Sequence, residues 1–337
     1  MSAEFPGFET PKDKVRWELN YLVGMDAVKE LVDDINNRNR LLCNQGATVV
    51  EQRLHTVILG NTGTGKTTAG QLFGHYMRCT KMVGSKTYKE VTGSQLVRMG
   101  SKKVEALFRP PPVDPMARRP RLLAINDMRR NQMPDIDTTD PANFSLDPGC
   151  LQSGGVLFID DAHQLVGPHA GADGQLILHI LQEAMDMLVG DLLIVFGGYE
   201  EEIQPLLEQN PALKARIPHI VRLKDFSDFQ MLEMLLDLID ERFHGKMTAE
   251  GDLDGQFMQA AVRQLGRGRG ERGFGNGRAV RDLLDEMCRR QARRLCARHD
   301  LRNAPPGRDV LLHLTKEDIL GPDAGDVMEI EDETGAL

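Results

Sequence analysis

Short apolar runs alternate with longer stretches of helical spacing over the first two thirds of the chain. Four of the runs are almost wholly apolar and a fifth alternates, which is typical of strands in a largely buried sheet. The stretches between them carry apolar residues three and four positions apart, as amphipathic helices do. This alternation predicts an α/β domain in which helices sandwich a five-stranded parallel sheet. The predicted strands are 55–59, 87–92, 156–159, 192–196 and 220–221.

The pattern changes at Asp225, after which only helical spacing follows. Ser227 and Gln230 have the spacing of a capping box at a helix start. We therefore predict a small all-helical domain over 224–321, following a large α/β domain over 21–223. The remaining parts are an N-terminal extension (1–20) and an acidic tail (322–337), which we expect to be disordered.

A segment rich in proline, arginine and aspartate interrupts the large domain at 109–153. It opens with Arg109-Pro110-Pro111-Pro112 and has neither strand nor helix periodicity. Between the predicted strand 87–92 and this segment lies 94–108, which we interpret as a loop leading into a helix. A structureless loop as long as 109–153 is uncommon inside a compact domain. We interpret it as a mobile insertion that either has no role or grips a partner.

Composition places the chain among ordinary globular proteins. Its 337 residues are 41% hydrophobic, and no apolar run is long enough to span a bilayer. The start lacks the basic and apolar segments of an export signal. Five cysteines without CxxC spacing indicate reduced thiols rather than a disulfide framework or a zinc site. We expect a soluble, intracellular, cytoplasmic protein without a membrane partner, and leave the nucleus open as an alternative.

Charge is distributed unevenly along the chain. The net charge of -9 disfavours bulk binding to nucleic acid. Twelve arginines nevertheless fall between Arg263 and Arg302, and Gly266 to Gly270 reads Gly-Arg-Gly-Arg-Gly. Such tracts occur in RNA-binding proteins, but this one is short and leads straight into a helix. We interpret it as a flexible approach to Arg278, an arginine at a helix start that can reach a phosphate.

A glycine-rich loop follows the apolar run at 55–59 and precedes an amphipathic helix. Its glycines allow successive backbone N–H groups to face a phosphate, Lys66 can reach the outer phosphates, and Thr67 offers a hydroxyl to magnesium. This is a complete Walker A pattern, which predicts binding of ATP with Mg²⁺. The predicted binding residues are Gly60, Asn61, Thr62, Gly63, Thr64, Gly65, Lys66, Thr67 and Thr68.

A second signature ends the third predicted strand. The apolar run 156–159 is followed by Asp160 and Asp161, which is a Walker B pattern. We expect Asp160 to hold the magnesium through water, and Asp161 to orient or deprotonate the attacking water. The alternative is a buried strand that ends in an aspartate turn, and the upstream glycine-rich loop argues against it.

Three weaker signals complete the predicted site. Tyr199 ends an apolar strand and is a candidate polar residue near the γ-phosphate, or an aromatic residue that fills the strand end. Arg216 precedes the last predicted strand, where it can enter a neighbouring subunit's site as an arginine finger, or lie solvated on the surface. Val23 and Gly24 form a short apolar-glycine segment that can pack on the adenine, or simply turn the chain into a helix.

The order of these motifs resembles the AAA+ ATPases of the CbbX/CfxQ and stage V sporulation protein K type. The resemblance covers roughly 22–321 apart from the insertion. It includes an Asn-Pro-x-x-x-x-Arg finger segment, matched at Asn210 and Arg216, and an Asn-Ala-Arg sensor-2 motif, matched at Asn276 and Arg278. Fungal proteins that string several such modules together also have Thr-Gly after the second strand, as at Thr92 here.

The resemblance implies a ring, expected to be a hexamer of this chain or of homologous AAA+ modules. Its subunits would hydrolyse ATP at their interfaces and remodel a protein client. Two features depart from the family pattern. Walker B usually ends Asp-Glu, whereas Asp161 is one methylene shorter, and misplacement on that scale can cost about a hundredfold in rate. The stretch 96–100 lacks the aromatic pore residue of the red-type rubisco activases.

Two other functions remain open at this point. The chain can be a nucleotide-binding structural subunit with little or no hydrolysis, because Asp161 replaces the usual glutamate. It can also be a nucleic-acid motor or binder, which the arginines of 263–302 and of the insertion would support, although we do not expect nucleic acid as a partner.

Overall fold

The computed structural model describes residues 11–46, 52–109, 146–298 and 306–321. Most of the insertion, the acidic tail and the first ten residues of the N-terminal extension lie outside the described residues. By their contacts the residues divide into two units. Of the described residues, those from 11 to 60 and from 66 to 223 form the large unit, and those from 224 to 321 form the small unit together with Asn61–Gly65 of the glycine-rich loop. In the part of the chain that the structure describes, no helix is both long and apolar enough to cross a bilayer.

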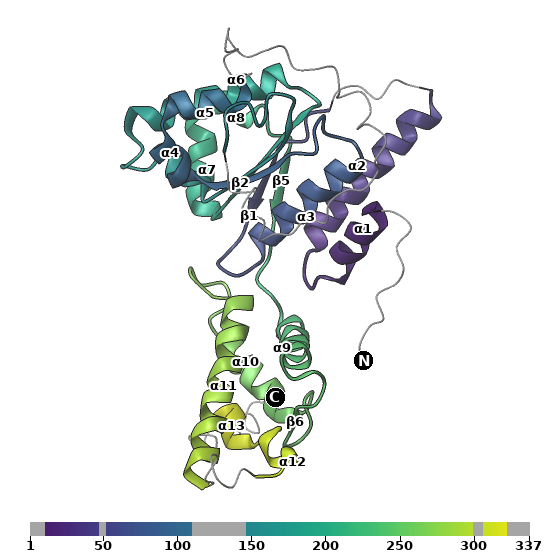
Figure 1. The fold of residues 1–337 in the computed structure, drawn as a ribbon, viewed down its shortest axis with the longest axis vertical. Coiled ribbons are helices and arrows are strands. Elements are labelled where there is room, and N and C mark those ends of the chain that lie inside the picture. Colours follow the sequence, from purple (N-terminus) through teal and green to yellow (C-terminus); the bar gives the residue numbers. More distant parts are fainter. Residues whose placement is uncertain (1–10, 47–51, 110–145, 299–305, 322–337) are drawn as a thin grey trace, which may run out of the picture. The chain divides into compact units, whose positions relative to one another are not determined.

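A five-stranded parallel sheet forms the centre of the large unit (Figure 1). Its spatial order is β2-β3-β4-β1-β5. The strand β4 therefore lies between β1, which the glycine-rich loop follows, and β3, which the acidic pair follows. This confirms the predicted parallel sheet. The strands are β1 (Thr56–Leu59), β2 (Tyr88–Thr92), β3 (Gly155–Asp160), β4 (Leu192–Gly198) and β5 (His219–Arg222).

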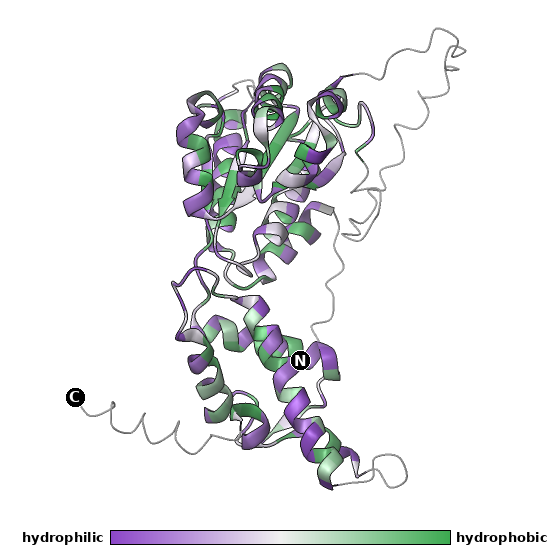
Figure 2. Ribbon diagram, turned by 90° about the vertical axis from the view of Figure 1, so that its left-hand side faces the viewer, coloured by the Kyte–Doolittle hydropathy of each residue, from purple (hydrophilic) through white to green (hydrophobic). Residues whose placement is uncertain are grey.

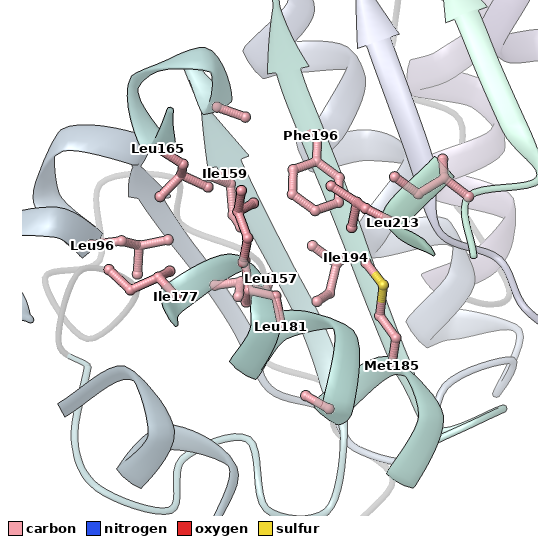
Figure 3. Packing of buried hydrophobic residues seen from close by; sticks show 14 of the residues in the cluster. Leu96, Leu157, Ile159, Leu165, Ile177, Leu181, Met185, Ile194, Phe196 and Leu213 are labelled. Carbon is pink, nitrogen blue, oxygen red and sulfur yellow. The ribbon is translucent and has the colours of Figure 1, made fainter. Parts of the chain in front are cut away.

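Both faces of the sheet are buried because apolar side chains alternate between them. On β3, Leu157 and Ile159 join one core cluster, while Val156 and Phe158 join the other. The first cluster also receives Phe196 of β4 and residues of the helix that follows β3 (Figure 3). Figure 2 accordingly shows strands that are largely hydrophobic and helices in which hydrophobic and hydrophilic residues are mixed.

Helices cover the two faces separately (Figure 1). One face carries α1 (Pro11–Tyr21), α2 (Asp26–Asn44) and α3 (Lys66–Cys79). The other carries α4 (Gly93–Met99), α5 (Ser101–Phe108), the 3-10 helix η3 (Ala162–Leu165), α6 (Gly171–Met187), α7 (Glu200–Gln209) and α8 (Pro211–Lys214). The segment that we counted as an extension contributes to the core, because Val15 and Leu19 of α1 are buried.

The stretch 94–108 differs from the prediction of a loop leading into one helix. It forms α4 and α5, which Gly100 separates. Thr92 starts α4 with a capping box that includes Gln95. Gly100 has a φ of 79°, which ends α4 at low steric cost because glycine tolerates the left-handed region. The capping signal was present in the sequence, but the stretch was too short for its periodicity to indicate two helices.

The described ends of the insertion are anchored in the large unit. Phe108 is buried at the end of α5, and Leu151 is fully buried in the same core cluster. The backbone N–H of Leu151 donates to Leu107 O at 2.9 Å, and that of Gly149 donates to Ala106 O at 2.7 Å. The last residues of the predicted insertion therefore pack against α5, and the two described ends lie side by side.

The small unit is built from helices around one core cluster. It also contains two short strands, β6 and β7, which pair in parallel through Thr248 and His313. The prediction of an all-helical domain missed them because each strand has only two residues. The elements are α9 (Asp228–Phe243), β6 (Thr248–Ala249), α10 (Gln256–Gly266), α11 (Gly277–Arg298), α12 (Arg308–Leu311), β7 (His313–Leu314) and α13 (Lys316–Leu320).

The glycine-arginine tract at the end of α10 is tied to the start of α9, so its interpretation as a flexible approach was wrong. Arg269 Nε donates to Phe226 O at 2.8 Å, and its guanidinium also pairs with Asp228. The N–H of Gly270 donates to Asp225 Oδ2 at 2.9 Å. These contacts fix the tract within the small unit. They also engage Arg269, which the RNA-binding alternative required to be available.

Candidate functional site

The candidate chemistry lies where β1, β3 and β4 end. In a parallel sheet the carboxyl ends of neighbouring strands share one edge, and ligands bind outside that edge. Leu59 of β1 is opposite Gly198 of β4, and the N–H of Gly60 donates to Gly198 O at 3.3 Å. The sheet register thereby brings Gly60 at the start of the glycine-rich loop, the acidic pair after β3 and Tyr199 after β4 to the same edge.

The loop between β1 and α3 has the backbone that a phosphate cradle needs. Gly63 and Gly65 have φ angles of 70° and 87°, a region that residues with a Cβ rarely adopt. Thr64 is buried, and its hydroxyl donates to Asn61 O at 2.9 Å. The helix α3 begins at Lys66, so the loop leads directly into a helix N-terminus, which favours an anion.

Lys66, Thr67 and Asp160 lie together in the large unit. Lys66 Nζ donates to Gly60 O at 2.9 Å, which keeps the ammonium group beside the loop. Thr67 Oγ1 donates to Asp160 Oδ2 at 2.9 Å. The structure thus brings the lysine and hydroxyl of the first motif together with the first carboxylate of the second. Thr68, by contrast, is exposed on α3.

Asp161 follows Asp160 in an unusual backbone conformation. Its φ and ψ of 47° and 46° are left-handed, and its N–H donates to Asp160 Oδ1 at 3.0 Å. Burial raises the pKa of Asp161, and the charge of Asp160 raises it further, while His163 and Lys66 act in the opposite direction. A carboxyl group whose pKa is raised accepts a proton more readily, which is a property of a general base.

Tyr199 lies beside Lys66 at the end of β4. Lys66 Nζ is 4.6 Å from the centroid of the Tyr199 ring, a cation–π contact. The tyrosine caps α7 with an extended backbone, at ψ 144°. The ring therefore contacts the lysine of the loop, and whether its hydroxyl meets a phosphate stays a prediction.

Two residues near the acidic motif were not predicted. His163 on η3 and Glu202 on α7 approach each other, with Nδ1 3.1 Å from Oε2 and both side chains mostly buried. Both lie close enough to Asp161 to affect its pKa. The acidic run 200–202 gave no sign that one member would turn inward, because three glutamates in a first helical turn also fit a solvated helix start.

Asn61 of the glycine-rich loop is bonded to Asp225 within the small unit. Its side-chain amide lies 3.0 Å from both oxygens of Asp225. Asn276, just before α11, is fully buried and donates to Thr62 O at 3.2 Å and to Asp225 Oδ1 at 2.8 Å. The sequence indicated Asn276 only as part of the sensor-2 motif and Asp225 only as the start of the helical domain. Their hydrogen bonds to the glycine-rich loop were not predicted.

The other predicted residues are placed as follows. Arg278 is the second residue of α11 and is exposed. Its backbone N lies 3.0 Å from the position that a Cβ on Gly63 would take, so it begins close to the loop. Val23 and Gly24 form the turn between α1 and α2, with Gly24 at φ 73°. The proposed contact of this turn with adenine stays a prediction.

Arg216 lies at the other edge of the sheet. It precedes β5, which runs parallel to β1, whereas the glycine-rich loop follows β1. Each of the two strands has four residues, and a strand rises about 3.3 Å per residue, so Arg216 and Gly60 are separated by roughly the length of these strands. Its guanidinium pairs with Asp186, which Arg53 Nη2 also contacts at 3.0 Å. The hydrogen bond from Arg216 lowers the pKa of Asp186.

These features define a class of protein. They are the features of a P-loop nucleoside triphosphatase with a helical lid: a parallel sheet of order β2-β3-β4-β1-β5, a glycine-rich loop between β1 and α3, an acidic pair after β3, and a helical unit after the sheet. A family model described as an AAA lid domain matches residues 243–329.

Comparison with curated proteins finds relatives within that class. Protein CbbX of Cereibacter sphaeroides is 33% identical over 42% of this chain and 44% of its own length. Stage V sporulation protein K of Bacillus subtilis is 26% identical over 84% of this chain and 76% of its own length. Protein CfxQ of Xanthobacter flavus is 31% identical over 42% of this chain and 43% of its own length. The chain is therefore similar to CbbX, CfxQ and stage V sporulation protein K, and these matches together with the AAA lid match support an assignment to the AAA+ proteins.

The extent of these matches differs. The alignments with CbbX and CfxQ span less than half of either relative. Among solved structures, the AAA domain of FIGL-1 in complex with ADP aligns over 83% of this chain and 76% of that chain, with 15% identity and a TM-score of 0.46. At that level of similarity, the fold assignment rests on the strand order and on the lid match instead.

Proposed function

We propose that this protein binds ATP with Mg²⁺ and hydrolyses it to remodel a protein client. The observation that carries the proposal is the contact between Thr67 Oγ1 and Asp160 Oδ2, at 2.9 Å, beside Lys66 at the start of α3. A hydroxyl, a carboxylate and an ammonium group at the end of a glycine-rich loop are the groups that P-loop enzymes use on a nucleoside triphosphate.

Each residue has a role that follows from its chemistry. The loop N–H groups and Lys66 would bind the phosphates, and Thr67 and Asp160 would hold the magnesium. These two residues fit Mg²⁺ because it prefers oxygen ligands and usually takes only one or two from the protein. The bound ion would neutralise charge on the phosphate oxygens. Asp161 would orient the attacking water and accept its proton, which its raised pKa favours.

The site would be completed by a second copy. Arg216 lies at the edge of the sheet opposite its own loop, so its charge can reach a transition state only in a neighbouring subunit. We expect the copies to form a ring, a hexamer of this chain or of homologous modules. The protein client is expected from the family and is not identified by any residue of this chain.

Phosphate release tests the proposal. Wild-type protein with ATP and Mg²⁺ is expected to release phosphate, and Lys66→Ala is expected to lower the turnover at least about a hundredfold, because a preorganised charge on the reacting group is lost. Lys103→Ala, an exposed lysine on α5, is the matched control and should retain the wild-type rate. A wild-type protein without magnesium-dependent phosphate release at high concentration would contradict hydrolysis.

A nucleotide-binding structural subunit is the second candidate, and Asp161 favours it. The carboxylate is one methylene shorter than the usual glutamate and sits on a left-handed backbone. Asp161→Glu separates the two candidates. A large rise in turnover would support the structural subunit as the natural state, whereas an unchanged or lower turnover would support an enzyme adapted to aspartate.

A further inference from the structure

The carboxylate of Asp225 binds two segments of the small unit that are distant from it in sequence, the glycine-rich loop and the connection between α10 and α11. Asn61 of the glycine-rich loop donates to it at 3.0 Å, and Asn276 at the start of α11 donates to Oδ1 at 2.8 Å. The N–H of Gly270, between α10 and α11, donates to Oδ2 at 2.9 Å. Charge-assisted hydrogen bonds of this kind are stronger than those between neutral groups. One carboxylate therefore ties the first residues of the loop to the start of the helical domain.

Asn276 reinforces the same connection from a buried position. None of its surface is exposed, and its φ of 47° lies in the left-handed region, which asparagine tolerates better than most residues. Its Oδ1 accepts from the N–H of Phe226 at 2.9 Å, and its Nδ2 donates to Thr62 O at 3.2 Å. A single side chain thus satisfies one backbone group of the helical domain and one of the loop.

The backbones of the two segments are also in direct contact. The N–H of Gly277 donates to Gly63 O at 3.1 Å. A Cβ on Gly63 would lie 1.9 Å from Gly275 O, so no side chain fits at that position. Thr62 and Gly63 therefore each have their carbonyl oxygen held by the segment 275–277, within the unit to which the loop residues belong.

We infer that Asp225 and Asn276 are positioning residues for phosphate binding. They hold residues Asn61–Gly63 in the one conformation whose N–H groups can converge on a phosphate. A glycine-rich loop is otherwise conformationally free, and ordering it on binding would lower the affinity for nucleotide. The inference rests on the proposed nucleotide site and adds to it two residues outside the Walker motifs.

A purely structural role for the same residues gives different expectations, and two substitutions distinguish them. Asn276→Asp keeps the acceptor for the Phe226 N–H and the tolerance for positive φ, but removes the donors to Thr62 O and to Asp225. Asp225→Asn keeps the shape of the side chain and removes one negative charge. The two variants change the net charge in opposite directions, so a shared effect cannot come from charge alone.

The experiment measures equilibrium binding of a fluorescent ATP analogue with Mg²⁺, and amide hydrogen exchange of the nucleotide-free protein. Both variants are expected to bind the analogue about tenfold more weakly, since each loses hydrogen bonds that order the loop. Exchange in a peptide covering 61–65 should accelerate about tenfold, while that in the middle of α11 stays unchanged. Asn36→Asp, which loses a donor to Tyr76 Oη in the large unit, is the matched control.

Three results would overturn the inference. Affinity within about twofold of wild type in both variants, with unchanged exchange at 61–65, would mean that the network does not order the loop. Weaker binding by Asn276→Asp with tighter binding by Asp225→Asn would mean that only charge matters. Accelerated exchange along all of α11 would indicate unfolding of the small unit. If wild-type protein bound no nucleotide, the proposed function would fail and the positioning role for phosphate with it, while unchanged exchange at 61–65 in the variants would separately show that the network does not order the loop.

Discussion

His55 illustrates how burial determines the charge state of a single residue. It immediately precedes β1, only 1% of its surface is exposed, and its Nδ1 accepts the N–H of Ile194 at 3.1 Å. Burial lowers the pKa of His55 to about 4, and the charge of Arg53 contributes in the same direction, while Asp186 opposes them. The ring is therefore neutral in the folded protein at neutral pH, as its acceptor role requires.

The stability of the large unit should consequently depend on pH. The unfolded chain protonates His55 near pH 6.5, whereas the folded chain protonates it only near pH 4. Protonation therefore favours the unfolded chain, so the contribution of the neutral ring to the free energy of unfolding is complete above pH 6.5 and is lost as the pH falls toward 4. The expected loss is about 3 kcal/mol. His55→Asn keeps an acceptor for the Ile194 N–H but has no ring to protonate. The free energy of unfolding, measured with a denaturant, should therefore fall between pH 7 and about pH 4.5 by about 3 kcal/mol less in this variant than in wild type.

His179→Asn is the control for that measurement, because this histidine on α6 is largely exposed. It should leave the pH dependence of the unfolding free energy unchanged. An identical pH dependence in wild type and His55→Asn would contradict the assignment of the effect to this ring.

At the scale of elements, α13 is held to α11 by a buried ion pair. Arg294 Nη2 lies 2.7 Å from Asp318 Oδ2, and Asp318 is only 1% exposed. Burial by itself would raise the pKa of Asp318, but the hydrogen bonds from Arg294 and from Thr315 hold it below its ordinary value. Thr315 and Asp318 also form the capping box of α13, so the pair fixes both the start and the position of that helix.

Removing the charge of Asp318 should therefore destabilise the small unit. Asp318→Asn leaves Arg294 buried without its counter-charge, and loss of one partner of a buried pair typically costs about 3–5 kcal/mol. Chemical unfolding followed by a probe in the small unit measures the change. Asp285→Asn is the matched control, because its pair with Arg242 is exposed and should contribute less than about 1 kcal/mol. Equal effects of the two substitutions would contradict the argument from burial.

At the scale of the whole molecule, the proposed role of Arg216 as an arginine finger requires a second copy of the chain or a homologous module. It stands at the amino end of β5 and pairs with Asp186 in the isolated chain. To act in a neighbouring site, Arg216 must break its ion pair with Asp186 and bind the nucleotide of the neighbour instead. The exposed pair is weak enough for such an exchange.

Mixing two inactive variants tests this arrangement. Arg216→Ala should bind ATP normally and lose about a thousandfold or more in turnover, as loss of an arginine finger does. A mixture with Lys66→Ala should regain activity, because an intact loop from one variant then meets an intact Arg216 from the other. Arg242→Ala, an exposed arginine of α9, should leave turnover unchanged. Phosphate release no greater in the mixture than in the separate proteins would contradict a shared site.

Local sequence patterns were sufficient for the architecture and for the central motifs. The apolar runs predicted the parallel sheet because each strand is buried on both faces, and the glycine-rich loop and acidic pair are contiguous segments whose chemistry depends on near neighbours. The helix α4, where a loop was predicted, and the strands β6 and β7 were missed because they are too short to show a period.

The tertiary structure alone decided which distant residues meet. No periodicity in the sequence relates the residues that form these contacts: His163 with Glu202, Asp225 with Asn61 and Asn276, and Arg216 with Asp186. The sequence by itself determined the class of protein, since buried strands, the glycine-rich loop and the acidic pair are patterns of consecutive residues. The supports of the site depend on how the chain packs, because a side chain's partner is set by distance in space and not by separation along the chain.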